Sequence, residues 1–232
     1  MTVKYHMDLI QGSPEWFAMR CGTLSASEMK LILTPKLKVA DNDKTKAHLW
    51  ELLGQRINKY VEPTYISDDM LKGGEVEIIA RAEYEKHYYP IQTCGGISND
   101  KFGFNIWYSP DGLVGSKGLW ESKSRRQGFQ FETICENVAT NTQPEEFVLQ
   151  SQTGLMVADD REWQDFTSYN GGTAMATIRV FPDPVIQEAI FRAAYLFEKK
   201  LKEKMAKYYE VMETRKSQLI PTERKIETEI LV

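Results

Sequence analysis

The sequence predicts an α/β fold in which helices cover both faces of a central mixed β-sheet. Helical patterns fill the N-terminal third, short glycine-interrupted strand patterns follow, and a second strand pair is enclosed by helical patterns towards the end. No repeat and no Pro/Gly/Ser-rich linker divides the 232 residues, so we expect one domain over 1–232. Residues 217–232 are expected to form an edge strand, or a flexible tail that binds a partner.

Local signals predict four helices in the N-terminal part. Ser13 before Pro14 is typical of an N-cap followed by proline at the first helical position, which predicts a helix to Arg20. Ser25-Ala26-Ser27-Glu28 matches a capping box, so a second helix should begin at Ser25. Apolar spacing predicts two more helices, over 44–60 and over 68–89, the last starting properly after its glycine pair.

The remaining elements follow from alternation, glycine breaks and helical spacing. We expect strands at 90–98, 102–112 and 118–123, helices at 127–137 and 144–159, strands at 162–170 and 175–182, and a long charged helix over 184–216.

Composition excludes several classes of protein. A net charge of −4 gives no overall sign of nucleic-acid binding, although a local basic cleft would suffice. No apolar run approaches a membrane span and no signal peptide is visible, so we expect a cytoplasmic protein. The 3 cysteines lie far apart, which argues against a disulfide framework. The phosphate-binding loop of ATP-driven motors is missing, so we expect no use of ATP.

One stretch carries candidate chemistry: "SPDGLVGSKGLWESK", residues 109–123. Asp111 follows Pro110 where a strand should turn, and Glu121 and Lys123 are two apart, so they share a strand face. If the strands form a hairpin, Asp111 comes close to Glu121. Two carboxylates at one place need a cation, and hard oxygen ligands point to Mg²⁺ or Mn²⁺ rather than zinc.

A lysine beside such a metal ion can stabilise charge on a phosphate or position a water molecule. These parts would suit cleavage of a phosphodiester bond. The alternative is a surface turn with an aspartate cap and an exposed Glu-x-Lys. Leu119 and Trp120 favour the first interpretation, because apolar neighbours indicate an inner strand.

Three further features leave two interpretations open. Glu77 shares a helical face with Arg81, which is also typical of a surface ion pair. Gln152 falls on the apolar stripe of its helix, so it should face either a catalytic cleft or a structural hydrogen-bond partner. Arg20 and Ser27 flank a short connection that could fold both toward one anion site, or they are a surface residue and a helper to the Ser25 cap.

Four motifs in order carry a resemblance to a known family. They are "QGSPEWFAMRCGTLSASEM", "GGEVEIIAR", "SPDGL…LWESK" and "LQSQTGLMV", and they extend from Gln11 to Val157. The chain resembles the phage lambda-type exonucleases, viral recombinase nucleases with a PD-(D/E)xK core. The resemblance implies a restriction-endonuclease-like fold.

The resemblance also implies roles for individual residues. Asp111, Glu121 and the backbone carbonyl of Ser122 would bind a metal ion, and Glu77 would hold a second ion or its water shell. Lys123 would orient or activate the attacking water, with Gln152 beside it. The other implied positions are a 5′-phosphate pocket and a strand-separating apolar wedge: Arg20, Ser27 and Ser109 for the pocket, Met70 and Leu71 for the wedge.

The implied activity is a Mg²⁺-dependent 5′→3′ exonuclease on double-stranded DNA ends that leaves 3′ single strands for recombination. Two ions per site, with Mn²⁺ as a substitute, a ring-shaped homotrimer and a single-strand annealing partner are implied in the same way. Two alternatives stay open: a structure-selective or restriction-type endonuclease on the same core, and a non-catalytic DNA-end-binding recombination protein.

Overall fold

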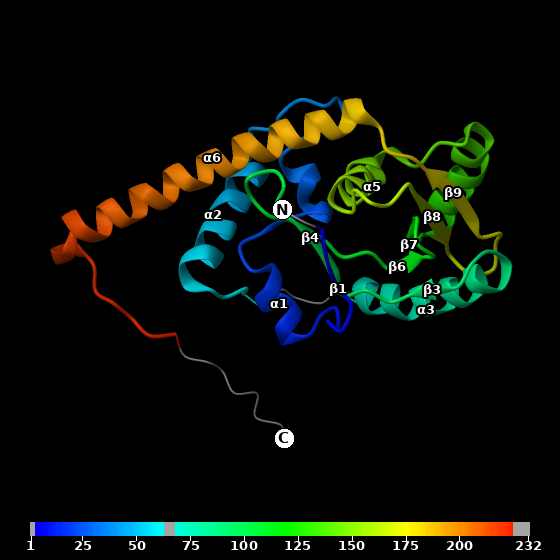
Figure 1. The fold of residues 1–232 in the computed structure, drawn as a ribbon, viewed down its shortest axis with the longest axis horizontal. Helices are drawn as coiled ribbons and strands as arrows, with labels where there is room; N and C mark the ends of the chain where they lie inside the picture. The colour runs from blue at the N-terminus through cyan, green and yellow to red at the C-terminus, as the bar shows by residue number, and fades with distance from the viewer. Residues whose placement is uncertain (1–2, 63–67, 225–232) are drawn as a thin grey trace, which may run out of the picture.

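The computed structural model describes residues 3–62 and 68–224, with the backbone alone described at 68–72. Strands in two mixed sheets and the helices around them form an α/β fold, which confirms the predicted class. Figure 1 shows the long helix α6 (Pro184–Thr214) crossing above the body and reaching past α2 (Asp43–Asn58). The strands β6–β9 gather at the opposite end of the view, with α3 (Asp68–His87) beneath them.

The larger sheet has five strands in the order β3-β6-β7-β8-β9. β7 and β8 pair in parallel over seven residues each, and the other pairs are antiparallel. The predicted hairpin is confirmed, because β6 pairs with β7 in a register that sets Gly112 opposite Trp120. The bounds of these strands are β3 Ile91–Gln92, β6 Gly112–Val114, β7 Gly118–Ser124, β8 Trp163–Tyr169 and β9 Ala176–Val180.

The smaller sheet has four strands in the order β1-β4-β5-β2, so the strands expected in one central sheet are divided between two. β2 runs parallel to β5, and the other two pairs are antiparallel. The loop from β5 to β6 passes from one sheet to the other and contains Asp111. The bounds are β1 Lys4–His6, β2 Leu24–Ser25, β4 Gly96–Asn99 and β5 Ile106–Tyr108.

The first two helical segments begin where the sequence predicts. Helix α1 (Pro14–Arg20) is capped by Ser13, whose side chain accepts a hydrogen bond from the Trp16 N–H. The capping box at Ser25 is present, but it opens the 3₁₀-helix η1 (Ala26–Leu31) rather than an α-helix. Its i→i+3 pattern is a tighter turn that suits a short connector.

Helix α3 begins at Asp68, before its glycine pair, and not after it as expected. A Cβ added at Gly73 or Gly74 would meet no atom within 4 Å, so no packing constraint explains these glycines. The helix covers one face of the five-stranded sheet, where Tyr84 packs on Trp120 with the ring centroids 5.6 Å apart. Ala80, Ile91 and Val114 complete this smaller apolar cluster.

Helix α5 (Glu145–Val157) covers the opposite face of the same sheet and contacts η1, α6 and β5. The ring of Phe147 stacks on Phe166 of β8 with centroids 5.2 Å apart. The expected helix at 127–137 is α4 (Gln127–Glu132) continued by a π-helical turn, η2 (Thr133–Val138). Together the two layers place the middle of β7 between α3 and α5.

The expected final helix ends at Thr214 and is followed by a 3₁₀ turn, η3 (Lys216–Gln218). Residues 219–224 form no strand, so the edge-strand alternative does not hold for the described part of the tail. Among the described residues, none of the helices combines the length and hydrophobicity needed to cross a bilayer.

Candidate active site

The Glu121 carboxylate lies at the centre of the candidate site. Glu121 is in the middle of β7, and only 1% of its surface is exposed. Its Oε1 accepts hydrogen bonds from Lys123 Nζ at 2.7 Å and from Gln150 Nε2 at 2.6 Å, and its Oε2 accepts one from the Tyr108 hydroxyl at 2.9 Å. A buried carboxylate with this many donors is held in one orientation.

Asp111 lies in the loop just before β6, next to the Gly112–Trp120 pair of the hairpin, and Glu121 follows Trp120 on β7. The Oδ2 atom of Asp111 accepts a 2.7 Å hydrogen bond from the N–H of Ser122. Desolvation, followed by the charge of Glu121, raises the pKa of Asp111 well above its ordinary value, although Lys123 and that N–H act in the opposite direction. The hairpin therefore brings the two carboxylates together, as the sequence predicts.

Lys123 supplies the positive charge nearest to these groups. Burial disfavours the ammonium, but the charges of Glu121 and Asp111 outweigh it and raise the pKa of Lys123. The Nζ atom also lies 5.6 Å from the centroid of the Phe147 ring. Lys123 is therefore a fixed cation and not a free base under ordinary conditions.

Glu77 of α3 interacts electrostatically with Glu121 and Lys123. Desolvation and the charge of Glu121 raise the pKa of Glu77, while Lys123 and Arg81 lower it. Arg81 does more than face Glu77, because its guanidinium donates to the Ile91 carbonyl and pairs with Glu85 at 3.6 Å. The charge of Arg81 is therefore shared with groups outside the cluster.

Asp111 and Glu77 line a cavity of about 420 Å³. Among the described residues, no three Asp, Glu, His or Cys side chains lie close enough to bind an ion by themselves. Asp111 and Glu77, with Glu121 buried beside them, nevertheless share the ammonium of Lys123. Burial, followed by the charge of Glu121, raises the pKa of both Asp111 and Glu77. Hard oxygen donors with excess negative charge fit Mg²⁺ or Mn²⁺, provided that backbone carbonyls and water complete the shell.

Gln152 does not lie beside Lys123, contrary to its predicted role. Its Nε2 donates to the Phe181 carbonyl at 2.9 Å, and its Oε1 accepts from the Asp183 N–H at 2.8 Å. These bonds fix the connection between β9 and α6, which is the structural alternative. Two residues earlier on α5, Gln150 reaches Glu121 instead.

Four residues at the site were missed by the sequence reasoning: Tyr108, Gln164, Gln11 and Gln150. Tyr108 and Gln164 surround Oε2 of Glu121, with the Gln164 Nε2 2.9 Å from the tyrosine hydroxyl. Gln11 donates to the carbonyls of Pro110 and Cys94, and so anchors the loop before Asp111. Gln11 and Gln150 both lie in the quoted motifs, which was the available signal, whereas nothing local marked Tyr108 or Gln164.

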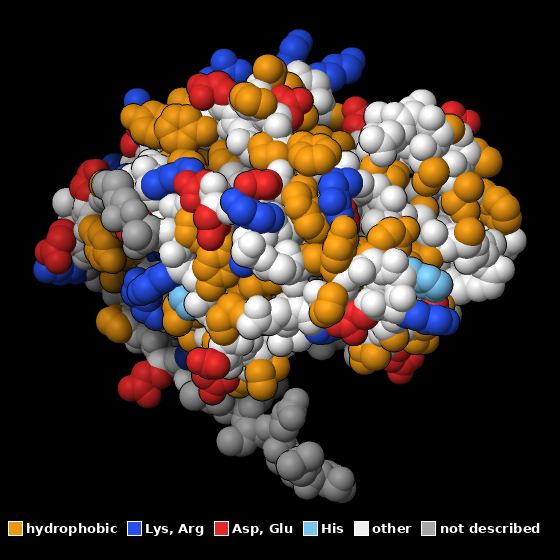
Figure 2. All heavy atoms as spheres, turned by 45° about the vertical axis from the view of Figure 1, so that its right-hand side comes forward, with side chains coloured by type: hydrophobic (Ala, Val, Ile, Leu, Met, Phe, Trp, Pro, Cys, Tyr) orange, Lys and Arg blue, Asp and Glu red, His pale blue; other side chains and the backbone are white. Residues whose placement is uncertain are grey.

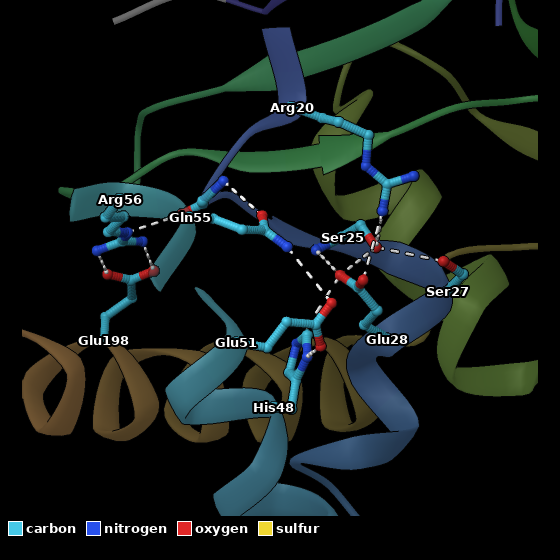
Figure 3. A network of polar contacts seen from close by, with 10 residues as sticks. Arg20, Ser25, Ser27, Glu28, His48, Glu51, Gln55, Arg56 and Glu198 are labelled. Carbon is cyan, nitrogen blue, oxygen red and sulfur yellow. Dashed lines mark hydrogen bonds and ion pairs between the residues drawn. The ribbon is translucent and has the colours of Figure 1, made fainter. Parts of the chain in front are cut away.

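The structure brings Arg20 and Ser27 together around Ser25. The Ser25 hydroxyl lies 3.5 Å from the Arg20 guanidinium and 3.2 Å from the Ser27 hydroxyl (Figure 3). The guanidinium also packs 4.5 Å from the centroid of the Trp16 ring. Ser27 itself is exposed. Arg20 and Ser27 thus form one cluster between α1 and η1.

Ser109 connects this cluster to the acidic cavity. Its hydroxyl accepts from the ring N–H groups of Trp16 and Trp107, and donates to the Gly95 carbonyl. Ser109 therefore has structural partners, and Trp16 lies between it and Arg20. Since Ser109 is two residues before Asp111, the arginine cluster and the acidic cavity are neighbours.

The side chains of Met70 and Leu71, named as an apolar wedge, lie outside the described residues.

The distribution of surface charge gives little further indication of where DNA would bind. On the face shown in Figure 2, basic and acidic side chains are interspersed rather than segregated. Any attraction to DNA on that face is therefore local.

Comparisons with known proteins identify the family. Residues 15–161 match the model of the YqaJ-like viral recombinase domain. No curated protein matches the chain. Among solved structures, the chain is similar to the alkaline exonuclease LHK-Exo of Laribacter hongkongensis, with 25% identity, a TM-score of 0.72, and coverage of 90% of this chain and 100% of that one.

The complex of LHK-Exo with dAMP gives 27% identity and a TM-score of 0.74, over 88% of this chain and 100% of that chain. A phage-related exonuclease of Haemophilus somnus 129PT shares the fold, with 13% identity, a TM-score of 0.50, and coverage of 79% and 96%. These matches confirm the resemblance drawn from the four motifs, and the family model covers more than half of the chain. The chain belongs to the YqaJ-like viral recombinase family.

Proposed function

We propose that the protein is a metal-dependent 5′→3′ exonuclease that degrades one strand of linear double-stranded DNA and leaves 3′ single-stranded overhangs for recombination by strand annealing. The observation that carries the proposal is the Glu121 carboxylate, buried on β7, bound by Lys123 and close to Asp111. The likeness to an alkaline exonuclease, also solved with dAMP, supports DNA as the substrate class.

Asp111, Glu121 and the Ser122 carbonyl are the groups that would hold Mg²⁺ or Mn²⁺, and Glu77 would hold a second ion. A bound divalent ion would supply Lewis-acid stabilisation of the phosphate and an activated water. Lys123 is kept charged by its two carboxylate neighbours, so it stabilises negative charge that develops on a phosphate oxygen, or orients the attacking water.

Gln150 and Tyr108 act on Glu121 rather than on DNA. Each donates to a different carboxylate oxygen, at 2.6 and 2.9 Å, which fixes the plane of the carboxylate. A ligand fixed in this way needs no reorganisation when the metal and the phosphate arrive. We assign to Gln150 the place beside Lys123 that the sequence assigned to Gln152.

The 5′ polarity rests on the Arg20 cluster next to the cavity. A guanidinium with nearby serine hydroxyls is a suitable partner for a terminal phosphate. Arg20 and Ser27 would contact the phosphate, and Ser109 would hold Trp16 against Arg20. In that arrangement the 5′ strand passes over the acidic cavity, and Met70 and Leu71 are the proposed wedge that separates it from its complement.

The proposed partners come from the family resemblance. They are a ring-shaped homotrimer around the DNA and a single-strand annealing protein that takes up the 3′ overhang. Size-exclusion chromatography with light scattering tests the first of these, and a trimer of about three times 26.7 kDa is the expected result.

Linear duplexes labelled at one end, incubated with Mg²⁺ and compared with closed circular DNA, test the activity. We expect loss of label from the 5′ end, faster digestion of 5′-phosphorylated than 5′-hydroxyl ends, and intact circles. Cleaved circles would identify an endonuclease instead. Binding to DNA ends without cleavage in Mg²⁺ or Mn²⁺ would leave a non-catalytic recombination protein.

A further inference from the structure

We propose that Glu28 tunes the 5′-phosphate pocket by exchanging partners: it pairs with Arg20 before DNA binds, and moves to His48 when a terminal phosphate takes Arg20. This inference rests on the proposed phosphate pocket and adds two residues to it. Glu28 belongs to η1 and His48 to α2, and Figure 3 shows both directed toward the same point.

Glu28 is a negative charge inside a cluster proposed to bind an anion. Its Oε1 lies 3.4 Å from the Arg20 guanidinium, and its Oε2 accepts from the Ser25 N–H at 3.1 Å and the Ser25 hydroxyl at 2.6 Å. The contact with Arg20 is longer than a good charge-assisted hydrogen bond. Arg20 is therefore held in place by Glu28 but is not tightly bound to it.

His48 lies beside Glu28 and can donate to it when the ring carries its proton on Nε2. Its side chain is 2% exposed, and Nε2 has no hydrogen-bond partner among the described residues. The Oε2 atom of Glu28 lies 3.8 Å from that nitrogen, while Nδ1 faces Glu51 at 3.2 Å. A neutral imidazole carries one N–H, so a bond from Nε2 to Glu28 requires Nδ1 to give up its contact with Glu51, whose side chain is exposed. We infer that this change accompanies the second position of Glu28.

The exchange follows from charge. A terminal phosphate carries about −1.5 to −2 charges near pH 7 and binds a guanidinium better than a single carboxylate does. Its arrival places it beside the Glu28 carboxylate, and the two repel. A shift of less than about 1 Å brings Glu28 into hydrogen-bond range of His48 Nε2, which offsets that repulsion.

The frame around these side chains is fixed, so a rotamer change of Glu28 suffices. Gln55 Oε1 accepts from the Gly22 N–H at 2.8 Å, and Arg56 Nε donates to the Gly22 carbonyl at 2.7 Å. Arg56 also forms a two-bond pair with Glu198 of α6. Gly22 has φ +69°, and a Cβ there would lie 2.5 Å from the Arg56 side chain, so glycine is required.

The exchange suits an enzyme that has to vacate its phosphate pocket repeatedly. Each cleavage creates a new 5′-phosphate, and the pocket must release one phosphate before the next enters. A carboxylate that competes for Arg20 weakens the pocket and speeds release. His48 limits that competition while the phosphate is bound.

Steady-state digestion of matched duplexes with 5′-phosphate or 5′-hydroxyl ends tests the proposal. Glu28→Gln removes the competing charge but keeps an oxygen for Ser25, so KM on 5′-phosphorylated ends should fall about threefold to fivefold while kcat also falls. His48→Phe should raise KM on the same ends by a similar factor, since Glu28 then has no alternative partner. For removal of the first nucleotide from 5′-hydroxyl ends, before any new 5′-phosphate has formed, both variants should match the unaltered protein.

His48→Gln places an amide donor near the position of Nε2 and should restore KM, whereas damage to packing would not be rescued in this way. Lys46→Ala is the matched control, because Lys46 lies on the same helix as His48 but pairs with Asp43 on the surface, and it should change KM less than twofold. Equal effects on both kinds of end, or a raised KM for Glu28→Gln, would overturn the proposal.

Binding of the two duplexes in Ca²⁺, measured by fluorescence anisotropy, separates this inference from the proposed nuclease activity. If the protein does not cleave DNA but Glu28→Gln still binds 5′-phosphorylated ends more tightly, the proposed exchange holds and the proposed exonuclease activity is wrong. If the protein cleaves linear DNA but the variants bind the two kinds of end as the unaltered protein does, the exonuclease activity holds and the exchange is wrong.

Discussion

The acidic cavity and the arginine cluster lie side by side but balance their charges differently. At the cavity, Asp111, Glu121 and Glu77 share the Lys123 ammonium, and negative charge remains. In the cluster, one guanidinium faces one carboxylate, and serine hydroxyls fill the remaining positions. The first region is short of a cation, whereas the second is internally paired.

This difference indicates how each region would meet a ligand. A cation at the cavity would meet carboxylates that outnumber the Lys123 ammonium, so metal binding should relieve repulsion. The cluster can accept an anion only by releasing a pair that it already has. Substitutions in the two regions should therefore differ in kind as well as in size.

The largest effect is expected from removing a charge at the cavity. Glu121→Gln or Asp111→Asn should lower Mg²⁺-dependent cleavage by about a thousandfold or more, because each removes a metal ligand and preserves shape. Duplex binding in Ca²⁺ should survive. Near-normal cleavage by either variant in a gel assay would contradict the ligand assignment.

Lys123→Ala should cost about a hundred- to a thousandfold in turnover with little change in DNA affinity. Its ammonium is held at the reacting region by Glu121 and does not depend on DNA for its position. Lys117→Ala is the control, since Lys117 pairs with Glu162 on the exposed surface. A defect that disappears at saturating DNA would remove Lys123 from the chemical step.

The two glutamines of α5 should separate activity from stability. Gln150→Ala should lower kcat about tenfold, because Glu121 loses one of the donors that orient it. Gln152→Ala should leave kcat intact and lower the free energy of unfolding by about 1–3 kcal/mol, since two backbone groups lose their partner. Kinetics and urea unfolding of both variants check this, and a reversed pattern would restore the site role of Gln152.

Arg20→Ala tests the cluster as a whole. The preference for 5′-phosphorylated over 5′-hydroxyl ends should vanish, and the tract degraded per binding event should shorten. Metal binding, followed by calorimetry with Mn²⁺, should stay unchanged. If the unaltered protein digests both ends equally, the arginine cluster has no part in end recognition.

The smallest expected effect tests the unequal charge balance of the acidic cavity and the arginine cluster. In EDTA, Asp111→Asn should raise Tm by about 2–4 °C, because it removes repulsion with Glu121 while an oxygen remains for the Ser122 N–H. Glu28→Gln should give no such gain, as Glu28 already has partners. A loss of Tm in the first variant would mean that the carboxylates are not in conflict.

Features that depend on residues close together in the sequence were predicted correctly. The Ser13 cap, the capping box at Ser25 and the hairpin that joins Asp111 to Glu121 follow from short-range patterns, and all three are present. The division of the strands into two sheets was not predictable, because pairing of β2 with β5 joins segments some 80 residues apart in the chain. The 3₁₀ form of η1 likewise reflects packing rather than propensity.

The error at Gln152 has a physical cause. A polar residue on an apolar stripe was expected to face the site, but α5 is buried on several sides, including Ser151, Gln152 and Thr153. In such a helix the stripe does not identify the face that meets the sheet. Gln150 is only half-buried, and its side chain donates to Glu121 on the sheet. The start of α3 was also misplaced, since exposed glycines within a helix carry no steric signal.

β7 pairs with β8 over seven residues and with β6 on its other edge. This pairing limits how the residues on β7 can change during evolution. Glu121 and Lys123 are paired with Phe166 and Ser168 of β8, and the residues just before them are paired with β6 as well, so few substitutions can move them without disrupting the sheet. The arginine cluster lies on the last residue of α1, the two-residue strand β2 and the short 3₁₀-helix η1. The kind of DNA end accepted can therefore diverge between relatives while the cleaving groups keep their geometry, which makes end preference the natural target for redesign.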